Sequence, residues 1–181
     1  KFGVDAKLCD LTNADEVEKM VDDNTCCIFL EIMTNPQMEV ADLRKLAAIA
    51  YAHNIPLVAD TTTIPFTMFS AHDLGVDIEV VSSTKYISGG ATSLGGLVID
   101  YGSTAGFADT MKFELLFNLG AYMNPNVAAM QTTGLETLDA RYRVQSANAS
   151  ELARRLQLLP GVRHVNYVGL ETNPFHRLAR E

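Results

Sequence analysis

The 181-residue sequence has little that would suit it to a membrane or to nucleic acid. Its longest wholly apolar runs, such as CCIFL at residues 26–30, fall far short of the ~20 residues that a membrane-spanning helix needs. No segment has the layout of a signal peptide. Lysine and arginine number 14 against 22 aspartates and glutamates, a formal net charge of −8, and no basic cluster offsets it locally. We therefore expect neither a nucleic-acid partner nor a membrane partner.

Cysteine is also scarce, because Cys9, Cys26 and Cys27 are the three in the chain. The adjacent pair falls on a predicted buried strand, where its side chains would point to opposite faces. No Cys-x-x-Cys spacing or nearby histidine favours the alternatives, a metal pair or a redox thiol. The pattern is typical of reduced, packing cysteines in a cytoplasmic protein rather than of a disulfide framework.

What the first 100 residues do have is an alternation of helical and extended apolar patterns. Helical periodicity covers residues 11–24 and 40–54, and short apolar runs cover residues 26–32, 56–60, 78–82 and 94–100. The apolar runs are continuous rather than alternating, which is typical of strands buried on both faces. We therefore predict an α/β fold, a mostly parallel sheet with helices on both faces.

The remainder of the chain has a different character. A helix-rich region extends from about residue 104 to 159, with Pro125 at a predicted helix start. The segment PGVRHVNYVGL at residues 160–170 then predicts a turn and a new strand. Because this strand lies far in sequence from the sheet, we interpret it as the opening of a second domain.

Polar side chains follow the predicted strands at the points where the chain leaves them. Asn35-Pro36 follows the first strand, Asp60 closes the second, and Lys85 comes just after the third. Ligands of open α/β sheets bind outside the carboxyl ends of the strands, so we expect these residues to meet at one edge. Each also has an ordinary explanation when taken singly, as a turn former, a helix cap or a solvated loop lysine.

Taken together, these residues suit a cofactor that carries a cation, a carbonyl and a phosphate. Pyridoxal 5′-phosphate (PLP) has all three. A lysine amine forms its Schiff base, an aspartate keeps its pyridine nitrogen protonated, and hydroxyls with backbone N–H groups bind its phosphate. The hydroxyls that precede Lys85 match this need, whereas the glycines that follow it match neither common nucleotide-binding pattern.

The segment VVSSTKYISGGATSLGGLVID, with PLVAD and an E-x-x-x-NP pattern upstream, resembles the Cys/Met-metabolism PLP-dependent enzymes. This family includes cystathionine γ-synthase, cystathionine and methionine γ-lyases, and O-acetylhomoserine sulfhydrylase. The resemblance covers essentially the whole chain and implies fold type I. It places part of the PLP-binding large domain at residues 1–140, and a linker helix with the start of a small C-terminal domain at residues 141–181. The C-terminal stretch looks most like the sulfhydrylase branch.

The resemblance assigns a role to five residues. Lys85 matches the Schiff-base lysine, and Asp60 matches the aspartate on the pyridine nitrogen. Ser82 and Thr84 match the hydroxyls that bind the cofactor phosphate. Asn35 matches the asparagine near the cofactor 3′-oxygen and the substrate carboxylate.

Several features of the family pattern differ or lack a match. Thr61 stands where the family usually has asparagine, and Val81 and Gly90 stand where histidine is common. We find no match for the earlier phosphate loop, the stacking aromatic residue, the Tyr/Arg pair lent by a neighbouring subunit, or the later arginine. The chain thus resembles the middle of a protein roughly twice as long.

The reaction implied by the resemblance is γ-replacement on O-acetylhomoserine with sulfide, which gives homocysteine in the full-length parent. That parent would act on a small amino-acid substrate and form a homo-oligomer. A γ-lyase or γ-synthase of the same family is an alternative, and so is a catalytically incompetent fragment that only folds and associates. An α/β enzyme that modifies sugars or amino acids without PLP would leave the Lys85 segment unexplained.

Overall fold

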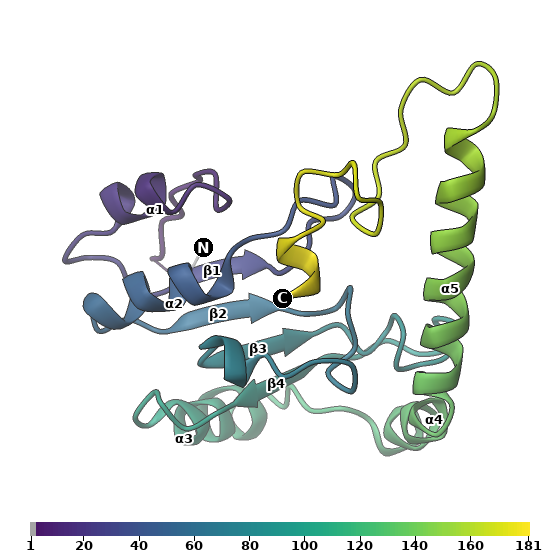
Figure 1. The fold of residues 1–181 in the computed structure, drawn as a ribbon. Coiled ribbons are helices and arrows are strands. Elements are labelled where there is room, and N and C mark those ends of the chain that lie inside the picture. The colour runs from purple at the N-terminus through teal and green to yellow at the C-terminus, as the bar shows by residue number, and fades with distance from the viewer. Residues whose placement is uncertain (1–2) are drawn as a thin grey trace.

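The computed structural model describes residues 3–181, and its centre is a single sheet (Figure 1). Four strands lie in the order β1-β2-β3-β4, with bounds Ile28–Glu31, Leu57–Asp60, Ile78–Val81 and Leu97–Asp100. The first three strands are parallel, and β4 is antiparallel to β3. The predicted α/β fold with a mostly parallel sheet is confirmed.

Except for one helix of 20 residues, the helices that connect and follow the strands are short. They are α1 (Ala14–Met20), α2 (Leu43–Ala52), η1 (His72–Leu74), α3 (Phe107–Thr110), the π-helical η2 (Met111–Phe117), α4 (Pro125–Leu135), α5 (Leu138–Gln157) and η3 (Leu178–Arg180). Pro125 is the first residue of α4, as predicted. Proline suits this position because its missing N–H would have no partner within the helix.

Helix α2 shows how the sequence pattern produces the local structure. The Asp42 carboxylate accepts a hydrogen bond from the backbone N–H of Lys45 at 3.2 Å, which caps the first turn. The buried residues of the helix lie on one face, and they are Leu43, Leu46, Ile49 and Ala50. The chain leaves the helix through Asn54 at a φ of 54°, a conformation that asparagine tolerates.

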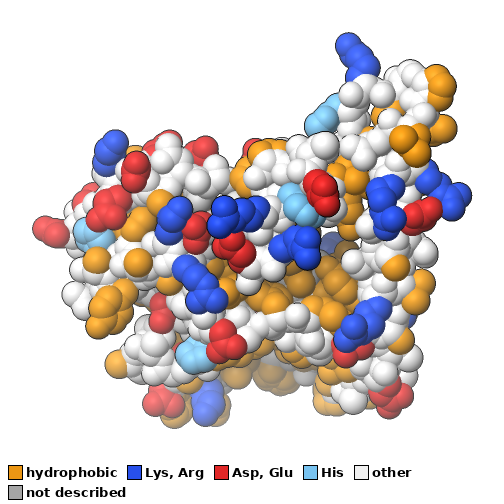
Figure 2. All heavy atoms as spheres, in the orientation of Figure 1, with side chains coloured by type: hydrophobic (Ala, Val, Ile, Leu, Met, Phe, Trp, Pro, Cys, Tyr) orange, Lys and Arg blue, Asp and Glu red, His pale blue; other side chains and the backbone are white. Residues whose placement is uncertain are grey.

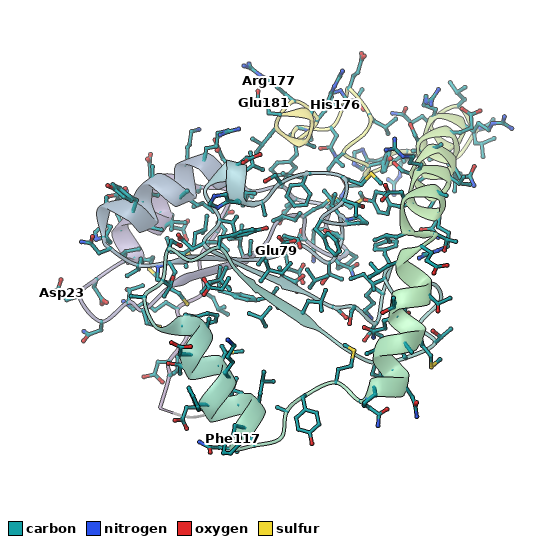
Figure 3. All side chains as sticks on the ribbon, turned by 90° about the horizontal axis from the view of Figure 1, so that it is seen from below. Asp23, Glu79, Phe117, His176, Arg177 and Glu181 are labelled. Carbon is teal, nitrogen blue, oxygen red and sulfur yellow. The ribbon has the colours of Figure 1, made fainter. Side chains whose placement is uncertain are left out.

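The two faces of the sheet differ in how well they are covered. In Figure 3, α2 lies on one side of the sheet and the helix that ends at Phe117 lies on the other. On the α2 side, Ile28, Leu30 and Ala59 are buried. On the other side, Phe29 is 56% exposed. The expectation that both faces are fully buried is therefore wrong for the described residues, since α3 and η2 cover the second face only in part.

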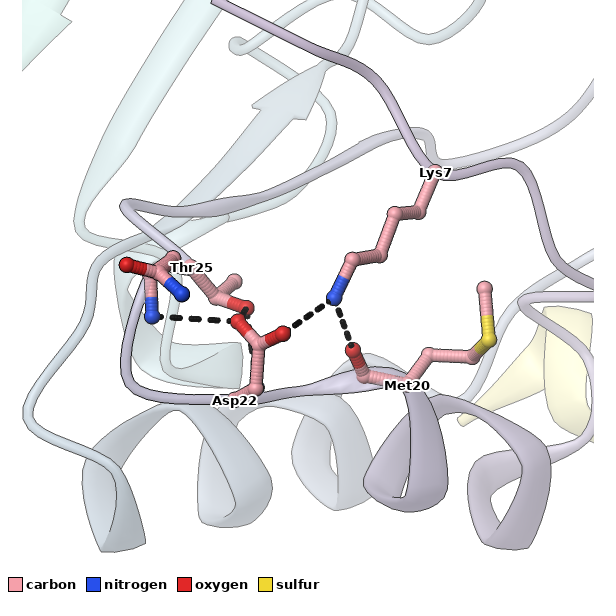
Figure 4. A network of polar contacts seen from close by, with 5 residues as sticks. Lys7, Met20, Asp22 and Thr25 are labelled. Atoms are coloured by element: carbon pink, nitrogen blue, oxygen red, sulfur yellow. Dashed lines mark hydrogen bonds and ion pairs between the residues drawn. The ribbon is translucent and has the colours of Figure 1, made fainter.

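A polar network anchors the N-terminal segment to α1 (Figure 4). The Lys7 ammonium donates to a carboxylate oxygen of Asp22 at 2.6 Å and to the carbonyl oxygen of Met20 at 3.2 Å. The hydrogen bond from Lys7 lowers the pKa of the Asp22 carboxyl. Because the pair is exposed, we expect it to contribute little to stability.

The C-terminal part stands beyond the carboxyl ends of the parallel strands (Figure 1). The domain boundary expected after residue 140 falls in the first turn of α5. The turn expected at the start of residues 160–170 is present, but the strand expected after it is wrong, because residues 162–167 of this segment have no regular secondary structure. Its backbone bonds locally, as in the 3.0 Å hydrogen bond from the N–H of Leu170 to the carbonyl oxygen of Tyr167.

The prediction that the adjacent cysteines lie on a buried strand is wrong, because both precede the strand. Strand β1 begins at Ile28, so Cys26 and Cys27 precede it, with Cys26 exposed and Cys27 half-buried. Both are free thiols, as is Cys9, and burial raises the pKa of Cys27. Over residues 3–181 the structure has neither a cluster of three or more metal-ligating side chains nor a helix long and apolar enough to cross a membrane.

Candidate functional site

The carboxyl edge of the sheet gathers four of the five residues predicted for the site. Asn35, Asp60, Ser82 and Lys85 line one small cavity of about 170 Å³. Parallel pairing explains this arrangement, because Glu31 lies opposite Asp60 and Asp60 lies opposite Val80 in register. The three strands therefore end level, and the residues that follow them converge.

Asp60 presents its carboxylate on the less covered face of the sheet. Its neighbour Ala59 is fully buried on the α2 side, so the strand alternation turns Asp60 the other way. One carboxylate oxygen accepts a hydrogen bond from the backbone N–H of Thr62 at 2.8 Å. No other group within residues 3–181 donates to this carboxylate, which leaves the second oxygen available to a ligand.

The two predicted phosphate-binding hydroxyls have different surroundings. Ser82 lines the cavity, its backbone N–H donates to the hydroxyl of Thr62 at 2.8 Å, and its own hydroxyl has no partner among the described residues. Thr84 lies outside this cavity. Its hydroxyl accepts from the N–H of Gly95 at 3.0 Å and donates to the carbonyl oxygen of Gly95 at 3.2 Å. Thr84 thus binds the glycine-rich loop in this conformation.

Lys85 follows Ser82 in a tight turn. Its backbone N–H donates to the carbonyl oxygen of Ser82 at 3.2 Å, and Ser88 braces the turn by donating to the carbonyl oxygen of Thr84 at 2.7 Å. The Lys85 ammonium pairs with no carboxylate in the described part of the chain. A primary amine held beside a cavity without a fixed partner can react with a carbonyl compound.

Glu31 is a cavity residue to which the sequence analysis assigned no role. Its carboxylate accepts a hydrogen bond from the backbone N–H of Asn35 at 3.0 Å, so it holds the turn that carries this asparagine. The peptide bond between Asn35 and Pro36 is cis. The E-x-x-x-NP spacing was the available signal, since it places an acid at the strand end four residues before the asparagine.

A second, larger cavity of about 1220 Å³ adjoins the first, because Asn35 and Lys85 line both. Figure 2 shows this hollow between the C-terminal segment and α5, with hydrophobic side chains at its base. Its walls come from the segments that follow the strands and from the C-terminal part of the chain. The cavity lies next to the smaller one and is large enough to admit a small organic molecule.

Specific hydrogen bonds attach the C-terminal walls to the sheet. The Arg141 guanidinium donates to the carbonyl oxygen of Tyr86 at 2.9 Å, next to Lys85. The Tyr142 hydroxyl donates to the carbonyl oxygen of Thr63 at 3.0 Å, and burial raises the pKa of Tyr142 to about 12. Near the other end, the Asn166 side-chain amide donates to the carbonyl oxygen of Gln37 at 2.7 Å, across 129 residues of sequence.

Comparison with known proteins identifies relatives over the whole chain. The model of the family described as Cys/Met metabolism PLP-dependent enzyme matches residues 1–181. Homocysteine/cysteine synthase of Saccharomyces cerevisiae is 32% identical, with 100% of this chain and 48% of that protein covered. Canavanine gamma-lyase of Pseudomonas canavaninivorans is 36% identical, with 99% of this chain and 44% of that protein covered. The chain spans about half the length of these relatives.

Solved structures show the same relationship. O-acetylhomoserine sulfhydrylase of Wolinella succinogenes superimposes with a TM-score of 0.87 at 39% identity, over 99% of this chain and 56% of that one. A structure described as a putative O-acetylhomoserine (thiol)-lyase of Campylobacter jejuni gives a TM-score of 0.90 at 31% identity, over 94% of this chain and 50% of that one. The latter structure carries pyridoxyl-lysine monophosphate, a cofactor joined to a lysine.

Proposed function

Because the chain belongs to the Cys/Met-metabolism PLP-dependent enzymes, we propose that Lys85, Asp60, Ser82, Thr84 and Asn35 form its part of the PLP site. We further propose that the full-length protein carries out γ-replacement on O-acetylhomoserine with sulfide to give homocysteine. The observation that carries the first proposal is the convergence of four of these residues on one cavity at the carboxyl edge of the sheet.

The side chains present fit the cofactor. Asp60 has a carboxylate oxygen without a partner among the described residues, Ser82 has an unused hydroxyl, and Lys85 has an ammonium without a carboxylate partner. The Asp60 oxygen can accept a hydrogen bond from the pyridinium N–H of PLP, and the Ser82 hydroxyl can donate one to its phosphate. The Lys85 amine can react with its aldehyde. When bound, PLP would withdraw electrons from the substrate and so make its α-proton acidic.

The roles of the residues follow from their positions. Asp60, oriented by the N–H of Thr62, would hold the proton on the pyridine nitrogen. Lys85 would attach the cofactor and, once the substrate amine displaces it, would move protons at the substrate Cα and Cβ. Asn35 would contact the 3′-oxygen and the substrate carboxylate from the turn that Glu31 holds.

The phosphate would bind to the hydroxyls of Ser82 and Thr84. Ser82 is ready for this in the present conformation, whereas Thr84 must exchange its hydrogen bonds with Gly95 for bonds to the phosphate. Gly95 lies in the segment that leads into β4, so phosphate binding would also reorganise that loop. Such an exchange replaces neutral hydrogen bonds with stronger, charge-assisted ones.

The choice of reaction rests on the likeness of the C-terminal stretch to sulfhydrylases and on the 39% identity to a solved sulfhydrylase. The 36% identity to canavanine gamma-lyase and the 33% identity to an L-methionine gamma-lyase of Fusobacterium nucleatum favour elimination as the second candidate. In this family the substrate cleaved would be methionine or cystathionine. Sulfide addition and elimination would use the same five residues and differ in the fate of the intermediate. We also propose a cytoplasmic location, supported by the free thiols, and a homo-oligomer, supported by the resemblance to the family.

Reduction with borohydride tests the site directly. PLP is added to this chain and to the full-length protein, and the reduced adduct is located by peptide mass mapping. We expect the adduct on Lys85, its loss in Lys85→Ala, and its retention in Lys112→Ala, a matched change at an exposed lysine on η2. Labelling of the full-length protein alone would show that this chain is an incompetent fragment. Equal labelling of many lysines in both would overturn the site.

Steady-state assays of the full-length protein test the reaction. We expect a higher kcat/KM for O-acetylhomoserine with sulfide than for cleavage of methionine or cystathionine. Preferential cleavage would replace the sulfhydrylase assignment with a lyase one and leave the PLP site unchanged.

A further inference from the structure

A buried carboxylate lies on the far side of the sheet from the cofactor cavity. Glu79, in the middle of β3, is 0% exposed, and Figure 3 places it at the centre of the molecule. It pairs in register with Ala59 of β2 and Ile99 of β4. Asp60 is the next residue along β2, so the two carboxylates point to opposite faces of the sheet.

Two hydroxyl groups satisfy the Glu79 carboxylate. The Thr61 hydroxyl donates to one oxygen at 2.5 Å, and the Tyr101 hydroxyl donates to the other at 2.6 Å. A buried carboxylate without partners costs several kcal/mol, so these bonds offset much of its desolvation. Burial, and then the bond to Glu79, raises the pKa of Tyr101 to about 12, which keeps its hydroxyl a donor.

Thr61 connects this network to the cofactor cavity. It follows Asp60 directly, and its backbone N–H donates to the carbonyl oxygen of Val80 at 3.0 Å. The next residue, Thr62, donates its N–H to the Asp60 carboxylate and accepts from the N–H of Ser82, both at 2.8 Å. The short turn after β2 is thus hydrogen-bonded to Glu79 through Thr61. Through Thr62 it is hydrogen-bonded to Asp60 and Ser82, two predicted cofactor ligands.

We propose that Glu79 is a positioning residue for the cofactor site, acting through Thr61 on the orientation of Asp60 and the placement of Ser82. The inference rests on the proposed function, because it concerns residues assigned to PLP. It adds a role for a residue that touches neither cavity. It also gives a reason for the threonine at position 61, whose hydroxyl donates to the carboxylate.

A purely structural role for Glu79 predicts a different outcome, and Asp77, the residue just before β3, provides the control. One Asp77 oxygen accepts the N–H of Leu57 at 2.8 Å, and the other accepts the Ser103 hydroxyl. Replacing Asp77 by asparagine disturbs another carboxylate with two hydrogen-bond donors, at the start of β3 and away from the carboxyl edge. It should lower stability without affecting the cofactor site.

The test uses Thr61→Val, which removes the hydroxyl at nearly constant shape, together with Glu79→Gln, Tyr101→Phe and Asp77→Asn. Amide hydrogen exchange of Thr62 and Ser82 is measured without cofactor, relative to that of Ala59 in the core. PLP affinity and the pH dependence of the bound cofactor's absorbance are then measured in the full-length protein. Thr61→Val should speed amide exchange at both Thr62 and Ser82. It should also weaken PLP binding by about tenfold and shift the pH dependence of the bound cofactor's absorbance. Tyr101→Phe should have smaller effects, and Asp77→Asn should change none of these readouts.

The readouts separate two kinds of failure. If Thr61→Val leaves exchange at Thr62 and Ser82 unchanged, the positioning role is overturned, whether or not PLP binds. If exchange changes as expected but PLP never labels Lys85 in the full-length protein, the proposed function fails and the link from Glu79 to the turn survives. A Glu79→Gln variant that does not fold leaves the decision with Thr61→Val.

Discussion

The sheet half and the helical C-terminal half of the chain use apolar residues in different ways. Helix α2 buries four of its 10 residues, whereas α5 buries two of its 20. Most of the buried hydrophobic side chains belong to one cluster around β1, β2 and α2. The first half thus supplies most of the packing that positions the site, while the second half reaches it through Leu138, which packs against Val81 and Ile87, and through a few hydrogen bonds.

The exposure of two leucines, one from each half, illustrates this contrast. Leu57 on β2 is 0% exposed, whereas Leu158 just beyond α5 is 82% exposed. Burial of a leucine side chain contributes about 1.5–3 kcal/mol, so only the first contributes much to folding of the described chain. The stability of the C-terminal half must therefore come from its contacts with the Lys85 loop and the turns beside it.

The largest effect we predict comes from breaking the core. Leu57→Ala should reduce the free energy of unfolding by about 2–5 kcal/mol, because it leaves a cavity between β2 and α2. Leu158→Ala should change it by less than about 0.5 kcal/mol. Urea denaturation followed by circular dichroism measures both. Similar losses for the two variants would remove the contrast between the halves.

A smaller effect should arise at the junction of the halves. A Cβ added at Gly134 in α4 would lie 2.1 Å from the carbonyl oxygen of Ile87, two residues after Lys85. Gly134→Ala should thus force α4 away from the Lys85 loop and cost about 1–3 kcal/mol. Thr133→Ala, on the exposed side of the same helix, is the control and should stay within about 0.5 kcal/mol. An unaffected Gly134→Ala would mean that this contact does not hold the halves together.

The smallest effect concerns alkaline pH. The pKa of Tyr142 is about 12 in the folded chain, raised from 10.0 mainly by burial. The folded state therefore keeps the phenol proton between pH 10 and pH 12 while the unfolded state loses it, so stability falls as the pH rises through this window. Tyr142→Phe should make this loss of stability smaller but should not abolish it, because Tyr101, whose pKa is also raised to about 12, is still present in the variant. Stability curves of equal slope for the two proteins would contradict the buried placement of Tyr142.

Much of the candidate site could be predicted because its residues follow the ends of recognisable strands. Asn35, Asp60 and Lys85 each follow an apolar run, and parallel strands bring such positions together. Glu79 could not be found this way. It interrupts the run IEVV, and an apolar pattern does not show that two distant hydroxyls satisfy one carboxylate.

The fold was predictable to a similar degree. Continuous apolar strands indicated the parallel sheet, but nothing in LVID shows that β4 runs antiparallel to β3. The length of the connection does not show it either, because residues 82–96 span nearly as many positions as residues 61–77, which join the parallel strands β2 and β3. The strand expected at residues 160–170 was wrong because periodicity does not reveal whether a neighbouring strand exists to pair with it.

The hydrogen bond from Asn166 to Gln37 has a consequence for the order of events during synthesis. Its two ends are 129 residues apart, so the wall of the larger cavity can close only after nearly all of this chain has left the ribosome. Contacts of such long sequence separation form late, since the chain must first lose the entropy of a large loop. We therefore expect the nascent sheet to leave Lys85 and Asp60 open to solvent before the larger cavity is complete.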